Sequence, residues 1–251
     1  MRRMMIRLVL SAVILTACAA TPAAAADKIL KESFGSGGRQ RTYYLYVPES
    51  VKAEKPAPLV VLLHGSGRNG LLLMERWKDL AAKEGIILAG PDSLNTREWN
   101  LGADGPDFIH DVVDIVSAQH PVDPRRVYLF GHSAGAGQGL MLSVLESQYF
   151  ASVAVHAGAL NQDAYALADS AVRKIPIGIW VGTNDRFFPV ATVRATRDLL
   201  AARAIPVQLT EIPGHTHDYY GRAADINKQV WAFLKGHVLT GDPIFARYDI
   251  K

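Results

Sequence analysis

The stretch that decides the fold is Arg126–Gly137, RVYLFGHSAGAG. Its apolar residues 127–130 are typical of a buried strand, and they run directly into the G-x-S-x-G pattern of residues 131–135. The serine of this pattern occupies a strained turn between a strand and a helix, and side chains two residues away on either side would clash with neighbouring backbone. We therefore predict that the Ser133 hydroxyl stands clear of the sheet, ahead of a helix over residues 138–148.

A serine hydroxyl is a weak nucleophile unless a histidine takes its proton and an acid orients that histidine. The chain offers both in the order serine, aspartate, histidine. Asp185 follows an apolar strand predicted over residues 177–181. His215 and His217 follow another strand, predicted over residues 207–212. Each candidate thus comes at the C-terminal end of its own strand, where parallel sheets gather their active sites, although an aspartate in this loop would also suit a turn.

An early strand, predicted over residues 59–63, ends in His64-Gly65-Ser66-Gly67. Glycines in such a loop let the backbone approach a substrate oxygen, and backbone N–H groups stabilise the negative charge that develops on it. The N–H groups of Ser66 and Ala134, the residue after the nucleophile, are the predicted oxyanion hole. His64 itself is expected to be a packed, hydrogen-bonded loop residue rather than a base.

Strand-like and helix-like runs alternate along the rest of the chain. Further strands are predicted at residues 41–47, 86–89 and 152–155, the first of them antiparallel, and further helices around residues 71–83, 108–116, 190–202 and 223–234. This alternation predicts an α/β fold with a mostly parallel central sheet and helices on both faces. The short connection between residues 155 and 177 leaves no room for a large cap domain.

With these pieces in place, the chain resembles the α/β-hydrolase superfamily. Within it, the chain is most similar to the lidless esterases grouped around feruloyl and acetylxylan esterases, S-formylglutathione hydrolases and polyhydroxybutyrate-depolymerase-like esterases. The resemblance covers residues 40–237, and its matching pieces are Leu63-His64-Gly65, Pro91-Asp92-Ser93, Trp99-Asn100, Asp123-Pro124-Arg125-Arg126-Val127-Tyr128, the serine turn, Gly182-Thr183-Asn184-Asp185 and the loop of His215 and His217. One departure is Ala136, where many relatives carry a second glycine.

The resemblance also bears on the choice of base. His215 follows a glycine, as the base often does in depolymerase-like esterases, whereas His217 precedes Asp218-Tyr219-Tyr220, which resembles the ending of feruloyl and S-formylglutathione esterases. We predict His217 as the base, with His215 as the alternative. The pair also opens several metallohydrolase motifs, but Tyr219 stands where their next aspartate would be, so no metal is expected.

Residues 1–26 indicate an export signal. Three arginines precede an apolar run over residues 8–20, and the segment ends in alanines that suit cleavage after Ala26. The apolar run is shorter than the ~20 residues that span a bilayer. Alternatively, Leu15-Thr16-Ala17-Cys18 resembles a lipobox, and the chain would then be cleaved before Cys18 and tethered to a membrane by a lipid on that cysteine. The alanine-rich end favours plain export, to the periplasm or the exterior.

The charge balance gives no sign of a nucleic-acid partner. The chain has 27 lysines and arginines against 24 acids, and the export signal holds three of the arginines and no acid, so the remainder is balanced. Cys18 is the one cysteine of the chain, so residues 27–251 are expected to form a single catalytic domain stabilised by its core rather than by disulfides. Membrane contact is expected only through a lipid anchor at Cys18.

These motifs together predict an exported serine esterase that works through an acyl-enzyme and needs no cofactor. Ser133 would attack the ester carbonyl, His217 would take the proton, and Asp185 would hold the imidazole. The expected substrate is a polymer-derived or short-chain ester, with Trp99 in its binding site. A serine peptidase or acyltransferase with the same triad is the alternative within enzymes, and a catalytically silent binding protein is the alternative outside them, because fold alone does not fix function.

Overall fold

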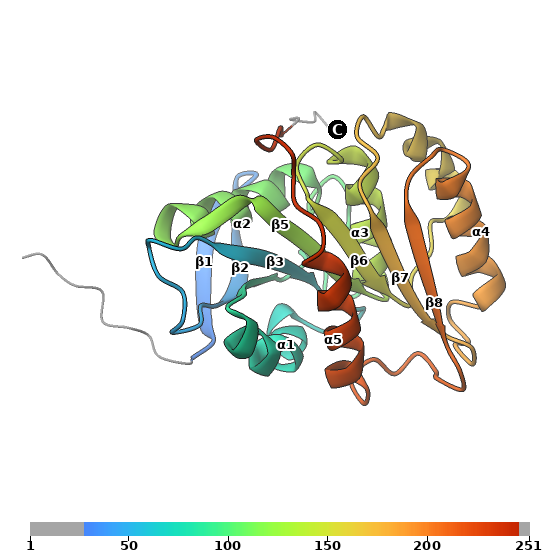
Figure 1. Cartoon of the computed structure of the whole chain (residues 1–251), viewed down its shortest axis with the longest axis horizontal. Helices are drawn as coiled ribbons and strands as arrows, with labels where there is room; N and C mark the ends of the chain where they lie inside the picture. Colours follow the sequence, from blue (N-terminus) through green and yellow to red (C-terminus); the bar gives the residue numbers. More distant parts are fainter. Residues whose placement is uncertain (1–27, 246–251) are drawn as a thin grey trace, which may run out of the picture.

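The computed structural model describes residues 28–245, and one eight-stranded sheet runs through them in the order β1-β2-β4-β3-β5-β6-β7-β8 (Figure 1). The strands are β1 (Leu30–Ser36), β2 (Arg39–Tyr46), β3 (Ala57–Leu63), β4 (Ile87–Pro91), β5 (Val122–His132), β6 (Ser152–His156), β7 (Ile177–Gly182) and β8 (Val207–Ile212). The helices are α1 (Gly70–Glu84), α2 (Pro106–Gln119), α3 (Ala134–Leu145), the 3-10 helix η1 (Gln162–Ser170), α4 (Val190–Ala201) and α5 (Ala223–Leu234).

The sheet is antiparallel at one end and parallel over the rest. β1 pairs antiparallel with β2, and β2 pairs antiparallel with β4. Every later pairing is parallel, from β4 with β3 to β7 with β8. The predicted α/β-hydrolase fold is therefore confirmed, and a single 3-10 helix, with no cap domain, fills the connection between β6 and β7.

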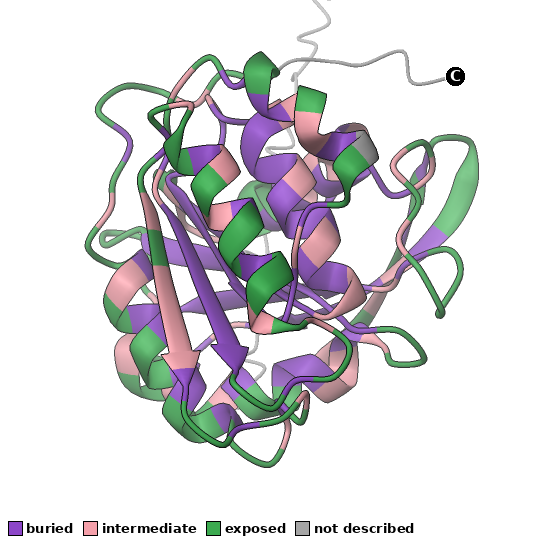
Figure 2. Cartoon of the chain, turned by 90° about the vertical axis from the view of Figure 1, so that its right-hand side faces the viewer, coloured by how far each residue is buried: buried purple, intermediate pink, exposed green. Residues whose placement is uncertain are grey.

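Helices cover both faces of the sheet, as predicted. Along β3 the side chains alternate, so that Leu59 and Val61 pack in the layer of α2, α3 and α4, while Val60 and Leu62 pack in the layer of α1 and α5. Because both faces are covered, the central strands are continuous apolar runs. Figure 2 shows this arrangement, with buried strands between helices whose outer faces are exposed.

Local signals set the helix ends. α1 begins after Asn69, whose side chain accepts a hydrogen bond from the Leu72 N–H, and it ends at Gly85, which has a φ of 71°. Both are standard caps, since asparagine satisfies a free N–H group and glycine adopts the left-handed conformation without a steric penalty. α2 begins with Pro106, which has no N–H to leave unpaired at that position.

The structure differs from the sequence-based expectations at three elements. β1 was not predicted, because it is an edge strand whose exposed face is polar. β5 begins earlier than predicted, at Val122. α3 starts directly after Ser133 rather than at Gln138, although its first turn, AGAG, has low helix propensity.

The N-terminal expectations concern residues that the structure does not describe. The export signal over residues 1–26, the lipidation site Cys18 and the start of the predicted catalytic domain at residue 27 all fall there. Within residues 28–245, no helix has the length and apolar character needed to cross a membrane.

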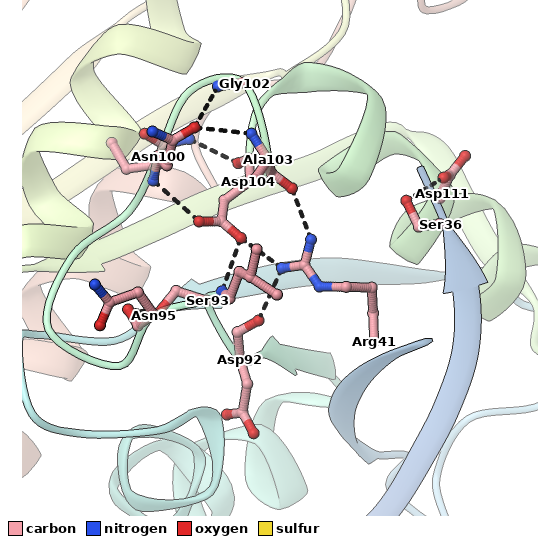
Figure 3. Close-up of polar contacts among 12 residues, drawn as sticks. Ser36, Arg41, Asp92, Ser93, Asn95, Asn100, Gly102, Ala103, Asp104 and Asp111 are labelled. Atoms are coloured by element: carbon pink, nitrogen blue, oxygen red, sulfur yellow. Dashed lines mark hydrogen bonds and ion pairs between the residues drawn. The ribbon is translucent and has the colours of Figure 1, made fainter. Parts of the chain in front are cut away.

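A buried ion pair ties the antiparallel end of the sheet to the loop after β4. Arg41 on β2 donates to the carboxylate of Asp104 at 2.5 Å and to the carbonyl oxygen of Ala103 at 2.6 Å. The Asp104 carboxylate also accepts from the N–H groups of Leu94 and Asn100, at 2.9 and 3.0 Å. Asp104 thus gathers both ends of this loop around one buried charge (Figure 3).

Two histidines end neighbouring strands inside the protein. His132 closes β5 and His156 closes β6, and the two are register partners in the sheet. Burial lowers the pKa of His132 to about 3 and that of His156 to about 2. Both imidazoles are therefore neutral in the folded protein at ordinary pH.

We predict that replacing Asp104 by alanine lowers the free energy of unfolding by about 3–5 kcal/mol, because it leaves the Arg41 guanidinium buried without a counter-charge. Urea unfolding of the purified protein measures the change. The matched control is Asp169→Ala, which breaks an exposed pair with Arg203 and should hardly move the midpoint. If Asp104→Ala and Asp169→Ala shift the urea midpoint by equally small amounts, the Arg41 guanidinium is stabilised by other partners in the absence of Asp104.

We also predict acid destabilisation by His132 and His156. Above pH ~6.5 both histidines are neutral in the folded and in the unfolded protein. Below that pH the unfolded chain binds protons on them, whereas in the folded protein they stay neutral until the pH reaches their lowered pKa values. The free energy of unfolding should therefore decrease as the pH is lowered, by up to about 1.4 kcal/mol per pH unit for each histidine. Urea midpoints measured between pH ~7 and ~4 should fall less steeply for His156→Phe than for the wild type. Identical slopes would contradict the prediction.

Candidate active site

Ser133 lies in the turn between β5 and α3, with a φ of 57° and a ψ of −116°. This positive φ is unfavourable for a residue with a side chain and persists only where neighbouring contacts hold it. The Ser133 N–H donates to the carbonyl oxygen of His156 at 3.0 Å, and the Ser133 carbonyl oxygen accepts from the Ala136 N–H at 2.9 Å. The strained turn that the sequence predicts is thus present, fixed to the neighbouring strand and to the helix.

The glycines of the pattern leave no room for side chains. A Cβ on Gly131 would lie 2.2 Å from the carbonyl oxygen of Gly135, and a Cβ on Gly135 would lie 2.1 Å from that of Leu63. The steric reason given for the pattern is confirmed. Ala136, the departure from many relatives, fits because it faces Gly158, where a Cβ would lie 2.3 Å from its own.

His217 connects the serine to the aspartate. Its Nε2 lies 2.9 Å from Ser133 Oγ, and its Nδ1 lies 2.9 Å from Asp185 Oδ2. A carboxylate only accepts hydrogen bonds, so Nδ1 carries the proton and Nε2 is left to accept from the serine hydroxyl. The structure thus brings together the nucleophile, base and acid that the sequence predicts.

Asp185 makes the contacts of both roles that its position suited. Its Oδ1 accepts hydrogen bonds from the N–H groups of Phe187 and Phe188, both at 2.9 Å, as a turn aspartate does. Its Oδ2 remains for His217. The carboxylate side chain has no exposed surface, so its charge acts on the imidazole without competition from water.

His215, the alternative base, does not face the serine. It is buried, and its Nε2 lies 3.2 Å from the Nε2 of His156. Burial lowers its pKa. His215 therefore packs against the end of β6, while His217 keeps 23% of its side chain exposed at the surface where a substrate could reach it.

The loop after β3 lies against the serine. A Cβ on Gly65 would lie 3.3 Å from the Cβ of Ser133. Among the described residues, neither the N–H of Ser66 nor that of Ala134 donates to a protein acceptor. Their role as oxyanion-hole donors stays a prediction.

Trp99 and His64 support this loop from behind. Trp99 Nε1 donates to the carbonyl oxygen of His64 at 2.8 Å, and its ring centroid lies 5.0 Å from the His64 ring. His64 is buried, its Nδ1 lies 2.9 Å from the Gly65 carbonyl oxygen, and its Nε2 accepts from the Ser93 N–H at 3.1 Å. His64 is thus the packed loop residue that was expected, whereas a contact of Trp99 with substrate stays a prediction.

Aromatic rings that the sequence reasoning missed surround His217. Phe188 stacks on it with centroids 5.8 Å apart, Phe187 lies 4.8 Å away and is 76% exposed, and His132 lies 5.1 Å away on the inner side. The two phenylalanines come after Asp185 and Arg186, and this aromatic pair close behind a candidate acid was the available signal. His132 occupies one of the two variable positions of the serine pattern, so nothing in the pattern marked it.

An open cavity of about 800 Å³ lies beside His217, lined by Thr183, Asn184, Asp185, Arg186, Phe187, Thr216 and His217. It combines an exposed phenyl ring, a guanidinium and several polar groups. Within residues 28–245, no cluster of three or more histidine, cysteine or acidic side chains is arranged to hold a metal ion.

Comparison with known proteins gives consistent relatives. Residues 41–212 match the family model described as esterase PHB depolymerase. A bifunctional acetylxylan esterase/xylanase of Neocallimastix patriciarum is 27% identical over 152 residues, 59% of this chain and 22% of that protein. A poly(3-hydroxybutyrate) depolymerase of Ralstonia pickettii is 25% identical over 146 residues, 48% of this chain and 30% of that protein. The matched part of each is thus less than a third of its length.

The solved structures agree on the fold. An S-formylglutathione hydrolase of Staphylococcus aureus superposes with a TM-score of 0.68 at 17% identity, covering 82% of this chain and 98% of that one. At this identity the likeness concerns the fold alone. The family match spans most of the sheet, from β2 through the serine turn to β8, and the chain therefore belongs to the esterase PHB depolymerase family, with an α/β-hydrolase fold.

Proposed function

We propose that the protein is a serine esterase that hydrolyses carboxylic esters through an acyl-enzyme. The observation that carries the proposal is the placement of His217, whose two ring nitrogens lie 2.9 Å from Ser133 Oγ and from Asp185 Oδ2. A nucleophile within hydrogen-bond distance of a base that is itself oriented by a buried acid is the arrangement that activates a serine hydroxyl.

In the first half-reaction, Ser133 Oγ attacks the ester carbonyl carbon as its proton passes to His217 Nε2. The buried Asp185 carboxylate stabilises the imidazolium that forms. The N–H groups of Ser66 and Ala134 donate to the oxyanion of the tetrahedral intermediate. This intermediate collapses to the acyl-enzyme, and the departing alkoxide takes the proton from His217 and leaves as the alcohol.

Water completes the cycle. It attacks the acyl carbon while His217 Nε2 takes one of its protons, and collapse of the second intermediate returns a proton to Ser133 and releases the carboxylic acid. Each proton that leaves a nucleophile goes to a leaving group through the same nitrogen. No cofactor takes part in these steps.

The family and the shape of the site support an ester as the substrate. The curated relatives act on acetylated xylan and on poly(3-hydroxybutyrate), as their names state. The connection between β6 and β7 contains only the short helix η1, and the cavity beside His217 is open. An open site of this kind suits a polymer-derived ester as well as a short-chain one.

We further propose that the protein is exported and acts in the periplasm or outside the cell. The support is the sequence of residues 1–26, with its basic start, apolar run and alanine-rich end. Lipid attachment at Cys18 is the alternative form of the same proposal. The N-terminal residue of the protein isolated from its host distinguishes Asp27 from a modified Cys18.

We predict that Ser133→Ala abolishes both esterase activity and labelling by a fluorophosphonate, because it removes the one oxygen that Nε2 of His217 activates. Hydrolysis of p-nitrophenyl butyrate and mass spectrometry of the labelled protein provide the measurements. Ser143→Ala, on the helix α3 that follows Ser133 and hydrogen-bonded to the carbonyl oxygen of Leu140, is the control and should keep both properties. Folded wild-type protein that takes no label would sink the esterase proposal.

We predict that Asp185→Asn lowers kcat by ~10²-fold or more, because the imidazole loses the charge and the acceptor that set its tautomer. The amide oxygen can keep the hydrogen bonds from the Phe187 and Phe188 N–H groups, so the turn should survive. The control, Asp198→Asn, changes an exposed carboxylate on α4 and should leave kcat unchanged. A near-normal kcat for Asp185→Asn would mean that another carboxylate acts on His217.

A further inference from the structure

Three buried histidines lie behind the proposed triad, and the mechanism above uses none of them. His132 ends β5, His156 ends β6, and His215 lies on the loop after β8. Their exposed fractions are 5%, 0% and 6%. His156 Nδ1 lies 3.1 Å from His132 Nδ1, and His156 Nε2 lies 3.2 Å from His215 Nε2. The three rings therefore form a continuous chain with His156 at its centre.

Both hydrogen bonds between the three histidine rings can form when all three rings are neutral. A neutral imidazole has one N–H donor and one nitrogen acceptor, so His156 can accept from one neighbour and donate to the other. The contacts then run in one direction, either from His132 to His215 or the reverse. Both nitrogens of His156 are used in either case. Buried polar groups that are paired in this way hold their neighbours in a defined geometry.

The surroundings keep the chain neutral. Burial is the main cause that lowers the pKa of each ring, and the neighbouring imidazoles add to it. The ionisable groups that face the chain are His217, Asp185 and Asp218, with Arg222 beside His215 and Tyr219 and Tyr220 packed on the rings. Among them the two aspartates favour protonation, but desolvation outweighs them.

The chain of three histidine rings connects the proposed nucleophile to the loop that carries the proposed base. His132 is the residue before Ser133, and His215 comes two residues before His217. On the other side of His217, Tyr219 is buried and its hydroxyl donates to Asn227 on α5 at 2.7 Å. The loop segment that carries His217 is thus held by a buried residue on each side, His215 and Tyr219. Of these two, His215 is the one that contacts the end of a central strand.

We propose that His156 is a positioning residue, which through its hydrogen bond to His215 holds the loop so that His217 stays within hydrogen-bond distance of Ser133. This inference rests on the proposed esterase function. The base lies on a loop, and a displacement of about 1 Å can cost ~10²-fold in rate. A side chain that fixes the loop therefore acts on kcat rather than on substrate binding.

The test compares three replacements of His156. An asparagine amide reaches the place of Nδ1, a glutamine amide reaches that of Nε2, and phenylalanine fills the space without a polar atom. His156→Gln keeps a partner for His215 and should stay within ~10-fold of the wild-type kcat, whereas Asn and Phe should each lower kcat by ~10²-fold, with KM changed by less than ~3-fold. The rate of fluorophosphonate labelling should follow kcat.

Urea midpoints show whether activity merely follows stability. His120→Phe, at the end of α2 and before the start of β5, is the control for replacing a partly buried histidine and should keep full activity. His215→Gln and His215→Asn make the same comparison of kcat at the other side of the hydrogen bond. They provide the test if the His156 variants do not fold. Because the three histidine rings are neutral, the ratio of wild-type kcat to variant kcat should stay constant from pH ~6 to ~9.

Three results would overturn the inference: near-normal kcat for all His156 variants, equal losses for Gln and Asn at both positions, or a ratio that changes with pH, which would mark a proton-carrying chain. Failure of the proposed function is separate, because it appears as activity in Ser133→Ala or as wild-type protein without label.

Discussion

The close approach of the start of α3 to the end of β3 is the constraint on which the rest of the site depends. Gly135 lies so near the carbonyl oxygens of Leu63 and His64 that no side chain fits. This contact forces the chain to turn sharply at Ser133, whose positive φ would otherwise be unfavourable. The loop after β3 also lies against the serine, since a Cβ on Gly65 would lie 3.3 Å from the Cβ of Ser133.

Buried polar groups then fix the loops around this turn. Asp104 and Arg41 hold the loop after β4, and that loop supports His64 and Gly65 through Trp99. The opposite side of the site is held by a chain of neutral imidazoles rather than by an ion pair. A paired charge is stable when buried only with good geometry, whereas neutral rings need only one donor and one acceptor at each contact.

Asp185 illustrates how one side chain joins the fold to the proposed chemistry. One carboxylate oxygen closes the turn after β7 through two backbone N–H groups, and the other orients His217. The turn thereby aims the second oxygen, and the exposed Phe187 carried by the same turn borders the open cavity. The proposed acid and an exposed ring beside the cavity are therefore placed by a single turn.

The sequence by itself determined the fold class, most of the elements and the order of the proposed nucleophile, acid and base along the chain. Strands buried on both faces are continuous apolar runs, and glycines two residues on either side of Ser133 have one steric explanation, so both patterns can be read locally. It did not reveal β1, whose polar face is exposed at the edge, or the true start of α3, where AGAG is helical because of contacts with β3 rather than propensity.

Only the tertiary structure decided which histidine meets the serine. His215 and His217 lie two residues apart in one loop, and their spacing suits either as the base. The choice follows from what each ring contacts: His156 at the end of β6 takes His215, which leaves His217 between Asp185 and Ser133. Those three partners come from the ends of β6, β7 and β5, and only the folded sheet brings these ends together.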